Sequence, residues 1–136
     1  MTRSVAISLG VIALLSLSAC GDDDDEAGTV DVSTTCDRVK DLGNAVLTIQ
    51  SASTVEEVEE TLAAPIAAFV EAAETSGDEE LAELAATYEA NFDEYLDAEG
   101  LDAREAADDV DVTLDRAAQR CIELGAMERD EFPQQP

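Results

Sequence analysis

Apolar residues recur at every third or fourth position through most of this chain, and that spacing limits its folded part to α-helices. The most regular example lies near the C-terminus, where steps of four and three residues alternate. An α-helix has about 3.6 residues per turn, so such steps put every member of the series on one face. The residues of this stripe are Ala103, Ala107, Val110, Leu114, Ala117, Cys121 and Leu124.

Three similar apolar stripes precede this one and predict three more helices. Their members are Cys36, Val39, Leu42, Val46 and Ile49; then Val55, Val58, Leu62, Ile66, Phe69 and Ala73; then Leu81, Leu84, Tyr88, Phe92 and Tyr95. Because the connections between the stripes are short, consecutive helices should run antiparallel. The sequence therefore predicts an all-α fold, a small antiparallel four-helix bundle over residues 33–125.

Capping residues mark where these helices should begin and end. Hydroxyls at residues 33–35 offer N-caps to the first helix, and Ser53 with Glu56 has the spacing of a capping box. The third helix should start from Asp78, with Glu79 and Glu80 favourably placed in its first turn. Glycines then follow the last three stripes, as they commonly follow helix C-termini: Gly77, Gly100 and Gly125.

Two residues inside the expected helices should change their packing. Pro65 lacks an N–H and its ring opposes the carbonyl of Thr61, so we expect the second helix to kink or to divide in two. Gly43 leaves room for the close approach of a neighbour to the first helix. Residues 126–136 form a C-terminal tail, in which Phe132 is the residue expected to dock back on the bundle.

The first nineteen residues have the layout of a secretory signal peptide. Arg3 supplies a positive charge and is followed by an apolar run that is too short for a transmembrane helix. The run ends in Leu17, Ser18, Ala19 and Cys20, which resemble the lipobox of bacterial lipoproteins. The resemblance implies that residues 1–19 are removed and that Cys20 is lipidated. The chain would then be anchored in the cell membrane, on its extracytoplasmic face.

A strongly acidic segment follows the lipobox. Residues 20–32 contain five consecutive carboxylates and little to bury, so they are expected to form a flexible, disordered tether. Calcium binding by this run is the less favoured interpretation, since a bare run does not make oxygen ligands converge. The net charge of −26 repels nucleic acid, which excludes it as a partner.

If Cys20 is lipidated, as the resemblance implies, the exported chain has two further cysteines, Cys36 and Cys121. An even pair in such a chain usually forms a disulfide. In an up-down-up-down bundle the start of the first helix and the end of the fourth lie at the same end, which brings Cys36 and Cys121 together. The sequence therefore predicts that one disulfide closes the bundle.

The residue types of catalytic and metal sites are scarce. Histidine is absent and Lys40 is the only lysine, so we expect neither an enzyme nor a cofactor. Residues 97–102 lack the terminal ligands of an EF-hand loop, and we expect no metal site there. The carboxylates of Asp108, Asp109 and Asp111 fan out around a helix and are expected to form a solvated face.

These observations favour a membrane-anchored extracytoplasmic helical lipoprotein that serves as a protein-interaction or accessory module of the cell envelope. Its partner, an envelope protein, should contact the outward loops around residues 51–53 and 99–100. The alternative is a membrane-tethered protein that binds a small ligand or a cation. Its pocket should lie beside the kink at Pro65, and the candidate contacts with ligand or partner are Phe69, Tyr88 and Phe92.

Overall fold

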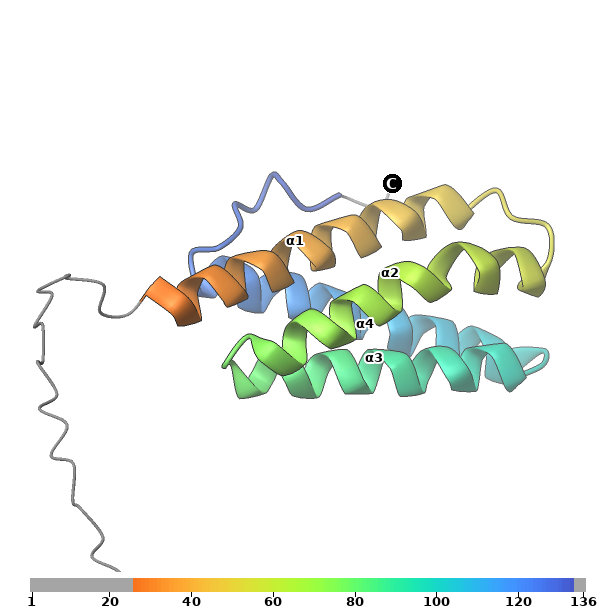
Figure 1. Ribbon diagram of the computed structural model, residues 1–136. Helices are drawn as coiled ribbons and strands as arrows, with labels where there is room; N and C mark the ends of the chain where they lie inside the picture. Colours follow the sequence, from red (N-terminus) through yellow and green to blue (C-terminus); the bar gives the residue numbers. More distant parts are fainter. Residues whose placement is uncertain (1–25, 134–136) are drawn as a thin grey trace, which may run out of the picture.

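The computed structural model describes residues 26–133, with side chains from residue 32 onward. It contains four α-helices: α1 (Glu26–Ile49), α2 (Val55–Thr75), α3 (Glu79–Asp97) and α4 (Leu101–Glu123). Each helix runs antiparallel to the one before it, and α4 returns beside α1 (Figure 1). The predicted all-helical four-helix fold is confirmed.

The residues of the predicted stripes fill or border the core, and the exposed ones among them lie at helix ends. Val55 is 46% exposed as the first residue of α2, and Leu124 is 37% exposed as the C-cap of α4. At the ends of a bundle no neighbouring helix covers such side chains. The core also contains small or polar residues that the stripes omitted: Ala85, Ala106, Thr113 and Ala118.

Helix α1 begins at Glu26, so the prediction of a start at residues 33–35 is wrong. The hydroxyl of Thr35 donates instead to the carbonyl oxygen of Ala72 in α2, at 2.9 Å. This buried contact holds α1 against α2 and does not cap a terminus. The helix also overlaps the second half of the expected tether. The signal peptide, Cys20 and residues 21–25 lie outside the described residues.

The N-cap of α2 is Thr54, one residue later than predicted. Its side chain accepts the backbone N–H of Glu57 at 3.2 Å, and the Glu57 carboxylate accepts the N–H of Ser53 at 3.0 Å. Glu57 therefore has the role that the sequence assigned to Glu56. The third helix was expected to start from Asp78, and Asp78 is the N-cap of α3, with its carboxylate accepting the N–H of Leu81 at 2.9 Å.

Helix α2 continues unbroken through Pro65, so it does not divide into two shorter helices. The proline removes one backbone hydrogen bond, which would weaken an isolated helix at this point. On either side of it, Leu62 and Ile66 are buried in the core. Packing of both halves against the other helices outweighs the loss of one hydrogen bond.

The C-terminal tail folds back along α1 (Figure 1). Met127 is buried, and Lys40 Nζ lies 3.1 Å from a carboxylate oxygen of Glu131. A Cβ atom on Gly43 would lie 2.9 Å from the ring of Phe132 and 2.9 Å from that of Pro133. The close neighbour expected at Gly43 is therefore the tail, and the docking of Phe132 is confirmed.

The two ends of the bundle differ. At one, here called the disulfide end, Cys36 and Cys121 are bonded across 85 positions of sequence with their Cα atoms 5.6 Å apart, which confirms the predicted disulfide. At the other, the distal end, the connections α1–α2 (residues 50–54) and α3–α4 (residues 98–100) lie together (Figure 1).

Candidate functional site

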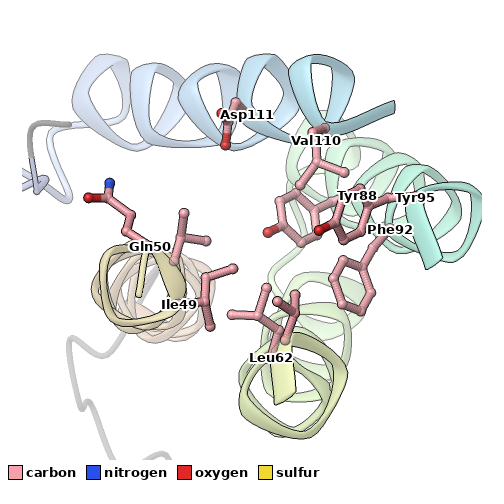
Figure 2. Close-up of a pocket in the computed structure, with 11 residues that line it drawn as sticks. Ile49, Gln50, Leu62, Tyr88, Phe92, Tyr95, Val110 and Asp111 are labelled. Atoms are coloured by element: carbon pink, nitrogen blue, oxygen red, sulfur yellow. The ribbon is translucent and has the colours of Figure 1, made fainter. Parts of the chain in front are cut away.

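A cavity of about 200 Å³ opens into the core in the distal half of the bundle. All four helices contribute to it: the end of α1, the start of α2, the second half of α3 and the first half of α4 (Figure 2). Its lining residues are Val46, Ile49, Gln50, Val58, Leu62, Tyr88, Phe92, Tyr95, Ala107, Val110 and Asp111.

One wall of the cavity is aromatic and comes entirely from α3. Tyr88, Phe92 and Tyr95 follow one another at steps of four and three residues, so they share one face of the helix. The rings of Phe92 and Tyr95 stack with centroids 6.1 Å apart and planes inclined by 28°. The opposite surface is aliphatic, from α1 and α2, so the cavity as a whole suits an apolar occupant.

The hydroxyl of Tyr88 is the exceptional polar group of this site. Tyr88 is 0% exposed, yet its hydroxyl oxygen has no hydrogen-bond partner among the described residues. Figure 2 shows it directed into the cavity. Burial, and to a lesser degree the Asp111 carboxylate, raise the pKa of Tyr88 above its usual value, so the hydroxyl stays neutral. It can donate one hydrogen bond and accept others.

Two further polar side chains line the cavity. Gln50 is exposed at the end of α1, and Asp111 is half-buried on α4, where it reaches toward the space between α1 and Tyr88 (Figure 2). The lining residues include no lysine or arginine. The one formal charge in the cavity wall is therefore the negative charge of Asp111.

Comparison of the chain with protein-family models, with curated proteins and with solved structures finds no significant match.

The structure brings together two of the three aromatic residues predicted to contact a ligand or partner. Tyr88 and Phe92 line the cavity, whereas Phe69 is completely buried in the core and does not reach it. The cavity also does not lie beside Pro65, where a kink was expected to open the bundle. α2 remains continuous there, and the cavity lies between the part of α2 that precedes Pro65 and the distal halves of the other three helices.

The expectation of a solvated acidic face on α4 is wrong for one of its three carboxylates. Asp108 and Asp109 are exposed, but Asp111 is half-buried and lines the cavity. The signal was present in the sequence, since Asp111 follows the stripe residue Ala107 by four positions and shares its face. The sequence interpretation placed Asp111 in solvent because aspartate is charged, and gave less weight to its position on the apolar face of the helix.

A second hollow, of about 460 Å³, lies between α3 and α4 toward the disulfide end. Its wall is mostly charged or polar, and Arg120 there contacts three carboxylates, those of Asp78 at 2.7 Å, Glu80 at 3.2 Å and Glu123 at 3.7 Å. These charges are already paired, and the contact with Asp78 ties the end of α4 to the N-cap of α3. We assign this hollow a structural role.

The part of the chain that the structure describes contains neither a candidate metal site nor a candidate transmembrane helix. No three metal-ligating side chains gather there into a possible ion site. Nor is any of its helices both long and apolar enough to cross a bilayer. Among the described residues, the distal cavity is thus the best candidate for a binding site.

Proposed function

We propose that this protein is an extracytoplasmic lipoprotein, held at the cell membrane through Cys20, and that its bundle acts as a binding module rather than as an enzyme. The resemblance of residues 17–20 to a lipobox supports the anchor. The Cys36–Cys121 disulfide supports an oxidising compartment outside the cytoplasm.

In this arrangement the cavity lies in the half of the bundle that is farther from the membrane. The anchor is joined to the bundle through α1, whose N-terminal part lies at the disulfide end, whereas the residues that line the cavity lie in the distal half. A lipid on Cys20 would therefore hold the disulfide end nearer the bilayer. The cavity would remain accessible to solutes and to other envelope proteins.

Within this role, binding of a small ligand is the favoured activity, and the observation that carries it is the Tyr88 hydroxyl. A buried polar group without a partner destabilises a fold, so its position facing a cavity favours a bound molecule as its partner. The volume is sufficient, since a cavity of about 150 Å³ in another protein binds benzene.

Recognition of an envelope protein at the distal end is the second candidate. Leu101, the first residue of α4, is 83% exposed, and Val55 at the start of α2 is 46% exposed. Both adjoin the two loops at which a partner was expected from the sequence. An exposed leucine beside these loops could bury its side chain against a partner.

Mass spectrometry of the full chain, extracted from the membranes of a bacterium that expresses it, tests the anchor. We expect the chain to begin at Cys20 and to carry acyl chains there. Cys20→Ala should remove the acyl chains and release or mislocalise the protein. The control Cys121→Ser replaces a cysteine of the disulfide, outside the lipobox, and should keep the lipid. An unmodified Cys20 in the wild-type chain would refute the anchor.

Crosslinking in cells separates the two binding activities. If a protein partner contacts the distal end, Leu101→Asp should abolish a specific crosslinked product, whereas Leu124→Asp at the disulfide end should leave it intact. Equal loss with both variants, or a product that neither variant changes, would refute a contact at Leu101. Neither residue lines the cavity, so small-ligand binding should be unaffected.

A further inference from the structure

We propose that the distal cavity binds a small organic ammonium ion, in which one positively charged amine is attached to a single aromatic ring or a short apolar chain. This inference rests on the proposed small-ligand function and adds the chemical class of the ligand. The observations that carry it are the apolar walls, the unpartnered Tyr88 hydroxyl and the Asp111 carboxylate.

The walls select the apolar part of the ligand. The aliphatic residues of α1, α2 and α4 oppose the aromatic face of α3, so a ring or short chain between them would contact carbon on most sides (Figure 2). At about 200 Å³ the cavity is smaller than most drug-binding sites, which limits the ligand to about the size of a substituted benzene.

The polar groups select the charge of the ligand. An ammonium group placed between Tyr88 and Asp111 would donate hydrogen bonds to the hydroxyl oxygen and to the carboxylate, and it could lie against the rings of Phe92 or Tyr95. A carboxylate in the same place would be repelled by the negative charge of Asp111. The net charge of −26 also attracts a cationic ligand and repels an anionic one.

A metal ion fits this cavity less well than an organic cation does. Calcium requires six to eight oxygen ligands, and magnesium requires near-octahedral coordination. The lining supplies one carboxylate, one amide and two hydroxyls, on walls that are otherwise hydrocarbon. A cation that brings its own apolar surface matches both parts of the site.

Isothermal titration calorimetry of the purified, oxidised protein with three probes of matched shape tests the proposal. The probes are benzylamine, benzyl alcohol and benzoate, at neutral pH and physiological salt. We expect benzylamine to bind at least about tenfold more tightly than benzyl alcohol, since a charge-assisted contact replaces a neutral one, and benzoate to show no binding.

Three variants locate the binding. Asp111→Asn should remove the preference for benzylamine over benzyl alcohol, and Tyr88→Phe should weaken the binding of both probes. The control Asp109→Asn removes one exposed carboxylate from the same helix, outside the cavity, and should bind as the wild type does. Far-ultraviolet circular dichroism and thermal melting verify that each variant is folded.

The outcomes separate the two levels of the proposal. If benzyl alcohol binds as tightly as benzylamine, the cavity is a small-ligand site but the ammonium assignment is wrong. If Asp109→Asn weakens benzylamine as much as Asp111→Asn does, binding reflects the charge of the whole surface and the assignment is again wrong. If no probe binds, the proposed small-ligand function is wrong as well. The lipid anchor is tested separately, by mass spectrometry.

Discussion

At the scale of single residues, Tyr88 is the side chain on which the proposed binding function depends most. A phenylalanine there would fill the same space without burying an unpaired hydroxyl. Stability alone would favour phenylalanine. The proposed ligand would supply the hydrogen-bond partner that this hydroxyl lacks among the described residues.

Tyr88→Phe should raise the free energy of unfolding by about 1 kcal/mol, because it removes a buried donor that has no partner among the described residues. Urea denaturation followed by circular dichroism measures the change. A decrease of similar size would show that the hydroxyl is hydrogen-bonded within the folded protein, which contradicts its proposed role.

Asp78 should make the stability of the bundle depend on acid. Hydrogen bonds from Arg120, and then from the N–H of Leu81, hold the pKa of Asp78 below its ordinary value of 3.8. Because the unfolded chain takes up the proton more readily, the stabilisation is complete above about pH 4 and is lost as the pH falls through the lowered pKa.

The substitution Asp78→Asn tests this, since asparagine retains the capping ability and removes the charge. We expect the variant to melt below the wild-type protein at pH 7 and the two melting temperatures to converge as the pH falls toward 2. A difference between the two melting temperatures that does not change with pH would mean that the carboxylate charge does not stabilise this contact. Glu83→Gln, at an exposed position on α3, is the matched control.

At the scale of elements, the interior of each helix and the C-termini of α2, α3 and α4 were predictable from the sequence, whereas the N-termini of α1 and α2 were not. Apolar spacing is repeated over several turns, so one irregular residue does not change the result. A cap depends on which of two adjacent hydroxyls reaches the first N–H groups, and here Thr54 does so instead of Ser53. In the cavity wall, Tyr88 and Phe92 were predicted as candidate contacts. The spacing of Asp111 from Ala107 indicated its position on the same face, but its charge was taken to mean a solvated side chain.

The contact between α1 and the tail supplies a prediction at this scale. Alanine stabilises a helix interior over glycine by about 1 kcal/mol, but a Cβ at Gly43 would collide with Phe132 and Pro133. We therefore expect Gly43→Ala to loosen the tail, with faster amide hydrogen exchange at residues 127–132, and to increase the free energy of unfolding little or not at all.

A double-mutant cycle isolates that collision. In a Phe132→Ala background the obstacle is smaller, so Gly43→Ala should recover much of the roughly 1 kcal/mol of helix propensity. Chemical denaturation of the four proteins measures the coupling. Equal effects of Gly43→Ala in both backgrounds would show that the tail does not restrict this position.

At the scale of the whole molecule, the disulfide and the cavity lie in opposite halves of one core. The disulfide joins the first and last helices, so it closes a loop that includes nearly the whole bundle. The distal half has no such covalent closure. The arrangement combines a covalently closed end beside the proposed anchor with a distal half that contains the cavity.

Replacing both Cys36 and Cys121 with alanine should lower the free energy of unfolding by about 4–5 kcal/mol, the chain-entropy value for a loop of 85 residues. Urea denaturation of the variant against the oxidised wild-type protein gives the difference. A loss below about 1 kcal/mol would indicate that the other contacts between α1 and α4 hold that end together without the bond.

The central claim, that a small organic ammonium ion enters the distal cavity, is tested most directly by nuclear magnetic resonance of the isotopically labelled, oxidised protein with benzylamine. We predict nuclear Overhauser contacts from the benzylamine ring to Tyr88, Leu62 and Val110, which lie on three different helices. Shift changes spread over the exposed carboxylates, with no contact to Tyr88, would contradict the account.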